Sequence, residues 1–159
     1  MRKYPFSAYD KYLCLRPDFM LWLTFIFLLR PYVVTVLSIA NRKDKTGLIN
    51  MMFEDKSVMV LAALAAIPAA MVLYAYFKRK PEGSERVRKI WRYGRHLLAI
   101  STLLNLGIVY VPYLTGMVHE ITLAGWIQSG ICVLILFYLF AEERAIDTFA
   151  DFPKQLDSD

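Results

Sequence analysis

Residues 19–40 read FMLWLTFIFLLRPYVVTVLSIA, and this stretch decides the fold because Arg30 is its only charged side chain. An α-helix needs about 20 apolar residues to cross the ~30 Å hydrocarbon core of a bilayer, at about 1.5 Å per residue. Three further apolar runs of similar length follow, at residues 58–77, 97–114 and 123–141. The sequence therefore predicts an all-α integral membrane protein, a four-helix bundle built as a single transmembrane domain over residues 1–159.

The composition of the whole chain favours the same class. Hydrophobic residues make up 57% of the 159 residues, and the mean hydropathy is +0.39. Typical soluble domains are about 45–50% apolar. A soluble bundle would need four helices that are apolar on every side, in a chain too short to bury them. The composition therefore disfavours a soluble protein.

The end of the first run, Ser38-Ile39-Ala40, has the small-x-small pattern of a signal-peptide cleavage site. The run before it is longer than the ~7–15 apolar residues of a signal peptide, and it contains Arg30 and Pro31. We therefore expect the first run to remain in the protein as a membrane helix.

Lysine and arginine are distributed unevenly among the segments outside the apolar runs. The two termini and the second connecting segment, residues 78–95, together carry fourteen, whereas the first connecting segment carries four. Positive residues accumulate on the cytoplasmic side of membrane proteins, so we expect both termini in the cytoplasm. Because this distribution is an orientation signal rather than a nucleic-acid footprint, no nucleic-acid partner is expected.

The basic segment at residues 78–95 is expected to lie against anionic lipid headgroups. Each Lys or Arg near a membrane surface contributes on the order of 1 kcal/mol to such binding. The expected lipid contacts are Lys78, Arg79, Lys80, Arg86, Arg88, Lys89, Arg92 and Arg95.

Small residues recur at helical spacing in two of the runs. The second run has Ala62, Ala66 and Ala70, and the fourth has Gly125 and Ser129. Small side chains let membrane helices approach closely, because lipid gives no hydrophobic drive for helices to associate. We therefore predict that these five residues form helix-packing faces.

Two features leave alternatives open. Residues 47–53, GLINMMF, are too short to span the membrane and predict an interfacial segment on the outer leaflet or a re-entrant loop. Pro31, Pro68 and Pro112 each lie within or near the end of a run. They predict modest kinks or, alternatively, broken helices around a transport site.

Arg30 is the residue on which the functional interpretation depends. It lies eleven residues into the first run, roughly 16 Å deep, where a charge costs from ~2.5 to more than 10 kcal/mol. Asn105 matches its depth best, and Ser101 lies one turn away on the same face. The other candidate partners of Arg30 are carbonyls freed by Pro31, a lipid phosphate, or an acid on another protein.

Signatures of enzymes and metal sites are absent from the sequence. His96 and His119 are expected at opposite membrane faces, so they cannot share a metal ion. Nucleophile elbows, zinc-protease motifs and phosphate loops are also missing. Cys14 and Cys132 are too far apart in the expected topology to form a disulfide. We expect neither catalysis nor a cofactor or metal.

Several short motifs, taken in their order, carry a family resemblance. They are Tyr9-Asp10, Pro17, Leu28-Leu29-Arg30-Pro31-Tyr32, Ser38, Gly47-Leu48-Ile49-Asn50, Phe53, Asp55 and Trp91-Arg92. In this order the chain resembles the YfeZ-like family of uncharacterised bacterial inner-membrane proteins, most clearly over residues 9–55. The resemblance implies a location in the bacterial inner membrane and brings no activity with it.

Together these features predict a small, non-enzymatic accessory or assembly subunit of a larger membrane complex. Its expected partners are membrane lipids and another membrane protein or a second copy of itself. The alternative is a small oligomeric transporter that binds an anionic solute at Arg30. A lipid-modifying enzyme is disfavoured because no nucleophile–base pair can be assembled.

Overall fold

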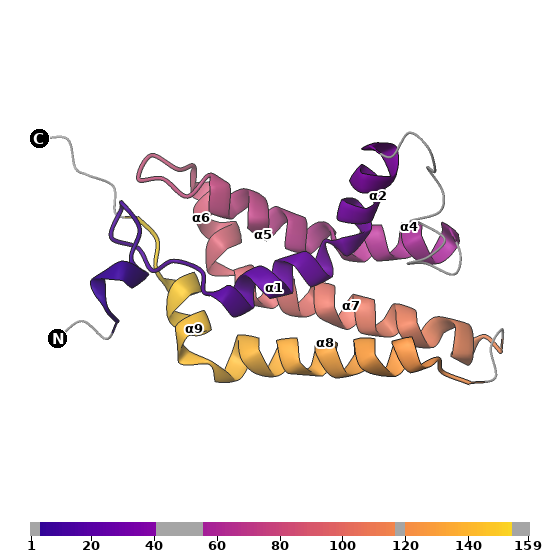
Figure 1. Ribbon diagram of the computed structural model, residues 1–159. Coiled ribbons are helices and arrows are strands. Elements are labelled where there is room, and N and C mark those ends of the chain that lie inside the picture. Colours follow the sequence, from indigo (N-terminus) through magenta and orange to yellow (C-terminus); the bar gives the residue numbers. More distant parts are fainter. Residues whose placement is uncertain (1–3, 41–55, 117–119, 154–159) are drawn as a thin grey trace, which may run out of the picture.

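The computed structural model describes residues 4–40, 56–116 and 120–153 (Figure 1). Over these residues the chain is helical and forms no strand; a single antiparallel bridge joins Tyr9 and Leu15. The elements are η1 (Phe6–Ala8), α1 (Phe19–Leu28), α2 (Arg30–Ala40), α4 (Lys56–Ala65), α5 (Ile67–Phe77), α6 (Glu85–Arg92), α7 (Gly94–Leu114), α8 (Leu123–Ala141) and α9 (Glu143–Ala150). The all-helical prediction is confirmed for the described part of the chain.

Two of these helices are each long and apolar enough to cross a membrane. They are α7, over Gly94–Val111, and α8, over Leu123–Ala141. The pairs α1–α2 and α4–α5 also qualify when each pair is taken together. Two helices, or up to four if each bent pair is one span, are therefore compatible with a membrane protein. The expected segment at residues 47–53 lies outside the described residues.

The first apolar run is not one helix with a modest kink, because α1 and α2 meet at 66°. Leu29 lies between them, with φ −89° and ψ 6°. Pro31 follows in the first turn of α2, and its ring removes the N–H that would continue the α1 ladder. The Leu29 carbonyl accepts instead from the N–H groups of Tyr32 and Val33, at 3.0 and 3.1 Å.

The second apolar run breaks in a similar way, with α4 and α5 at 43°. Ala66 separates the two helices, and Pro68 lies in the first turn of α5. Ser101 of α7 donates its hydroxyl to the Ala65 carbonyl at 2.7 Å, which supplies a partner for the backbone at the break. By contrast, α7 continues through Pro112 to Leu114.

Helix α7 is the element around which the others pack. It contacts α4, α5 and α8, while α1 lies on α5 and α7, and α2 lies on α4. Figure 1 shows α2 turning away from α8 towards α4. The main core contains Leu21, Phe25, Leu28, Val72, Trp91, Leu98 and Leu139, and a smaller cluster joins Val34 to Ala62.

The non-spanning elements gather at one end of the molecule (Figure 1). The N-terminal segment, α6, the turn before it and α9 all lie there. Tyr4 donates its hydroxyl to an Asp147 carboxylate oxygen at 2.9 Å. Asp18 caps α1 through the Leu21 N–H and also accepts the Tyr138 hydroxyl of α8. These contacts attach the N-terminal segment to α9, and the start of α1 to α8.

Candidate functional site

Arg30 begins α2, immediately after the bend. Its side chain is half-buried, and its guanidinium carbon lies 5.1 Å from the centre of the Phe27 ring. Stacking on an aromatic face is a favourable way to place a guanidinium away from water. The bend thus presents a cation in the middle of an otherwise apolar run.

Ser101 and Asn105 are buried in α7, but the structure does not join them to Arg30. The Asn105 amide donates to the Ser101 carbonyl at 3.1 Å, and the Ser101 hydroxyl is used on Ala65 of α4. Both side chains therefore satisfy the helix backbone. The sequence favours Asn105 as the partner because its depth in the membrane matches that of Arg30. The Ser101 carbonyl, one turn earlier in α7, competes with Arg30 for the Asn105 side chain.

The small residues predicted for packing lie at helix contacts. Ala62 and Ala66 are buried and Ala70 is half-buried on α4 and α5. On α8, a Cβ added at Gly125 would lie 3.2 Å from a Val109 methyl of α7. Ser129 accepts the Tyr110 hydroxyl of α7 at 3.2 Å.

The basic residues expected against lipid occupy three different environments. Lys78, Lys80, Arg86, Lys89 and Arg92 are exposed, Arg88 and Arg95 are half-buried, and Arg79 is buried with 4% exposure. The expectation that Arg79 contacts lipid is therefore wrong. Its side chain faces the protein interior because a carboxylate from the N-terminal segment lies there.

That carboxylate is Asp10, whose Oδ2 lies 2.9 Å from Nη2 of Arg79. The same nitrogen donates to the Leu15 carbonyl at 3.1 Å, and the guanidinium lies 5.0 Å from the Trp91 ring centre. Burial raises the pKa of the Asp10 carboxyl, but the Arg79 hydrogen bond and backbone donation from Cys14 and Tyr12 outweigh it. The net pKa lies below the ordinary value of 3.8.

Trp91 of α6 connects this pair to the C-terminal segment. Its ring is fully buried, and its Nε1–H lies 3.1 Å from both the Thr148 and the Asp151 carbonyls. The Phe149 ring packs on it at 4.8 Å between centres. An Asp151 carboxylate oxygen accepts the Leu15 N–H at 2.8 Å, which connects the C-terminal segment to the N-terminal segment.

Cys14 lies inside this assembly, with 2% exposure and a free thiol. Burial, and then the nearby Asp151 carboxylate, raise the pKa of the Cys14 thiol to about 11. The thiolate is the reactive form of cysteine, so this side chain is held in its unreactive state.

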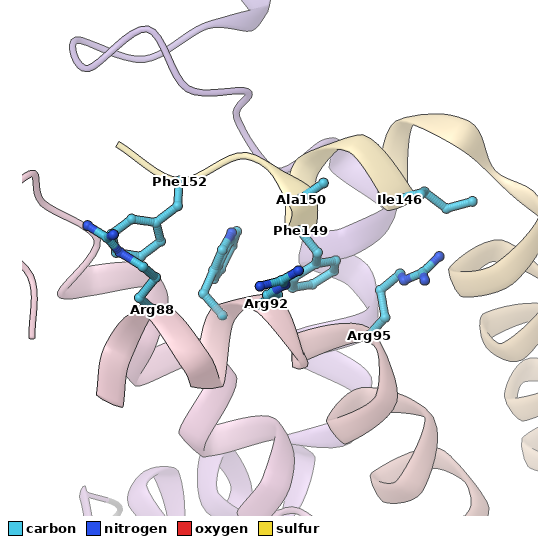
Figure 2. A pocket seen from close by; sticks show the side chains of 8 residues that line it. Arg88, Arg92, Arg95, Ile146, Phe149, Ala150 and Phe152 are labelled. Carbon is cyan, nitrogen blue, oxygen red and sulfur yellow. The ribbon is translucent and has the colours of Figure 1, made fainter. Parts of the chain in front are cut away.

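A cavity of about 380 Å³ lies beside Trp91 (Figure 2). Figure 2 shows Arg88, Arg92 and Arg95 on one side, with Ile146, Phe149, Ala150 and Phe152 facing them from α9 and the residues after it. The cavity thus combines three cationic groups with an apolar wall. We refer to this cavity as the basic pocket.

Sequence reasoning identified the three arginines of the basic pocket but not its opposite wall. The opposite wall comes from residues that follow the last apolar run, where Phe149 and Phe152 are the sequence signal of burial. Among the described residues, groups of His, Cys, Asp or Glu suited to a metal ion are not found.

The family of this chain follows from a match to the family model described as "Protein of unknown function (DUF2919)", over residues 4–151. Because the match covers most of the chain, the protein belongs to this family. Comparison with curated proteins and comparison with solved structures give no match. The resemblance to an uncharacterised family is confirmed at this level, while the YfeZ-like name is not part of the match.

Proposed function

We propose that this member of the DUF2919 family is a small, non-enzymatic accessory or assembly subunit that docks on a larger complex in the bacterial inner membrane. The observation that carries the proposal is Arg30, a cation at a 66° bend within an apolar run. The order of motifs that resembles the YfeZ-like family supports this location.

The membrane arrangement in this proposal takes each bent pair as one span. The chain then crosses the membrane four times, as a four-helix bundle with both termini on one side. The excess of Lys and Arg at the termini and in residues 78–95 supports the cytoplasm as that side. The N-terminal segment from Tyr4 and the C-terminal segment with α9 lie at one end of the molecule, which supports this arrangement (Figure 1).

Docking through Arg30 is proposed because a charged side chain within an apolar run is costly in free energy. A charge at this depth favours any neighbour that neutralises it. Helix α2 lies on α4, whereas α8 packs on α7 and α9. Helices α2 and α8 therefore diverge beyond the bend (Figure 1). The proposed occupant of this site is a membrane helix of another protein that carries an acidic side chain at the same depth.

Other polar side chains within the runs serve the helices themselves. Thr24, Thr102 and Ser129 each donate to the carbonyl four residues earlier, at 2.8–3.0 Å. Such bonds satisfy the hydroxyl donors locally. This use of the polar groups supports a non-enzymatic protein.

The deciding experiment is gentle purification of the tagged full chain from its native membrane, followed by intact-complex mass spectrometry. We expect a stoichiometric partner that is lost with Arg30→Leu, retained with Arg30→Lys, and retained with Arg86→Leu as the matched arginine control. The partner must carry an intramembrane acid whose neutralisation also abolishes the complex. A partner retained by Arg30→Leu overturns docking through this residue.

A transporter is the second candidate, and the two bent spans favour it specifically. Discontinuous helices are a common way to build a substrate site at the middle of a membrane. In this case the purified protein is a homo-oligomer without a foreign subunit. Reconstituted vesicles then show anion flux that Arg30→Leu abolishes; vesicles without flux across a broad anion panel argue against it.

A further inference from the structure

We propose that the basic pocket is a specific binding site for the headgroup of an anionic phospholipid. Its ligand-facing groups are Arg88, Arg92 and Arg95, and its opposite wall comes from α9 and from Phe152 after it. The proposal goes beyond the accessory-subunit function, because it names a second ligand at a different place in the fold.

The three arginines line the pocket from both sides of the α6–α7 junction. Arg88 and Arg92 lie at positions i and i+4 on α6, which places them on one face of that helix, and Arg95 lies in the first turn of α7. Figure 2 shows Arg88 beside Phe152 at one end of the cavity, Arg92 near its middle and Arg95 at the other end. Three positive charges therefore line a space large enough for a headgroup.

These guanidinium groups are not neutralised by the described parts of the protein. Arg88 lies 5.1 Å over the Phe152 ring, and Arg95 lies 5.7 Å over the Phe140 ring. Among the described residues, a carboxylate does not pair with Arg88, Arg92 or Arg95, and the buried Nε of Arg88 has no acceptor. A buried donor without an acceptor costs free energy unless a ligand or water satisfies it.

The nearby acids have hydrogen-bond or ion-pair partners other than the three arginines. Asp151 accepts the Leu15 N–H, and Asp147 accepts the Tyr4 hydroxyl. Glu85 pairs with Lys89 at 3.0 Å on the exposed side of α6. The pocket therefore offers arginines that match the geometry of phosphate oxygens.

The position of the pocket indicates a lipid rather than a soluble phosphate compound. It lies where α7, a candidate span, begins at Gly94, and where α8, another candidate span, ends at Ala141. Its wall is apolar, with Ile146, Phe149 and Phe152 facing the arginines (Figure 2). A headgroup held here would leave its acyl chains beside the apolar surfaces of α7 and α8, whereas a soluble phosphate would gain nothing from them.

The test is native mass spectrometry of the purified full chain, titrated with a two-phosphate phospholipid of the cardiolipin type, phosphatidylglycerol and phosphatidylcholine. We expect stoichiometric binding of anionic lipid, weakened about thirtyfold by Arg92→Gln with Arg95→Gln. The matched control, Arg86→Gln with Lys89→Gln, removes the same charge from exposed positions of α6. It should weaken binding by no more than about threefold.

Each remaining outcome overturns the proposal. Equal losses in the two double variants would mean diffuse attraction rather than a pocket. No loss in either would mean that the arginines of the basic pocket do not hold the lipid. Competition by soluble glycerophosphate at the concentration of the lipid would assign the site to a soluble phosphate compound. If the pocket double variant fails to elute as a folded species, Arg92→Gln alone decides, because the Arg92 side chain is exposed.

Discussion

At the scale of single residues, the pair formed by Arg79 and Asp10 explains how a charge can lie inside this small protein. The Arg79 side chain is 1% exposed and that of Asp10 is 23% exposed. Removing one member of a buried pair leaves the other uncompensated, at a cost of about 3–5 kcal/mol, or less where one partner meets water. The pair therefore controls how firmly the N-terminal segment is attached.

Arg79→Leu is expected to loosen this attachment and to expose Cys14. In a Cys132→Ser background, Cys14 is the single thiol, and its labelling by a maleimide reports opening. We expect labelling near neutral pH to accelerate by about tenfold. Lys80→Leu, the exposed neighbour, serves as the control and should leave the rate unchanged. Equal rates in the two variants would contradict a structural role for the pair.

The same pair predicts a dependence on acid. The pKa of Asp10 is lower in the folded protein than its ordinary value of 3.8, so the folded state binds fewer protons. The stabilisation is therefore present above pH 3.8 and is lost as the pH falls through the folded pKa. With Trp22→Phe and Trp126→Phe, Trp91 emission reports the transition. Asp10→Asn should abolish this acid step, whereas Glu82→Gln should leave it in place.

The two notable arginines differ in how far the sequence could predict them. Arg30 can be singled out because a lone charge in an apolar run is a local pattern. Arg79 cannot, because its carboxylate partner is 69 residues away along the chain and its carbonyl partner 64 residues away. Counting charges by segment places Arg79 at the membrane surface with its basic neighbours and cannot identify its buried partner.

At the scale of elements, the bend between α1 and α2 depends on Pro31. Pro31→Ala restores the N–H that a continuous helix requires, so we expect the pair to straighten. Spin labels at Met20→Cys and Ile39→Cys, with the native cysteines replaced by serine, should move apart by about 5 Å. Pro68→Ala, at the other bend, should leave this distance unchanged. An unchanged distance in Pro31→Ala would assign the bend to packing instead.

The contact between α7 and α8 gives a second prediction with a control on the same helix. A Cβ at Gly125 would lie 3.2 Å from a Val109 methyl of α7 and 2.9 Å from a methyl of Ile121, just before α8, whereas one at Gly130 meets nothing within 4 Å. Gly125→Leu should therefore destabilise the protein by about 1–3 kcal/mol. Gly130→Leu should be nearly neutral. Unfolding in a bilayer mimetic measures both, and equal effects would contradict the assigned contact.

The sequence predicted the apolar runs well because hydrophobic length is a local property. Both α7 and α8 fall where runs were expected. The short helices were harder: α9 has eight residues, and its attachment depends on Phe149 reaching Trp91. A hydropathy scan reads such a segment as a tail because its burial depends on a distant tryptophan.

At the scale of the whole molecule, the structure is polarised from one end to the other. Four segments interlock at the end that holds α6 and α9, through Arg79, Trp91 and Asp151. Toward the other end, α2 and α8 diverge around the bend (Figure 1). This division suits a protein that anchors one end at a lipid surface and offers the other to a membrane partner. The proposed function depends on the number of membrane crossings, because docking through Arg30 takes each bent pair as one span.

Cysteine accessibility in spheroplasts can count the crossings, using single cysteines at Ser84, Glu143, Lys45 and Thr122 in a chain without Cys14 and Cys132. If each bent pair is one span, an impermeant maleimide reaches positions 45 and 122 but reaches 84 and 143 only after permeabilisation. If the bent pairs are re-entrant, position 45 shares the protection of position 84, since only α7 and α8 then cross. The positive-inside distribution favours the first pattern. Labelling of position 84 from outside would instead reverse the orientation and place the basic pocket at the outer face of the membrane.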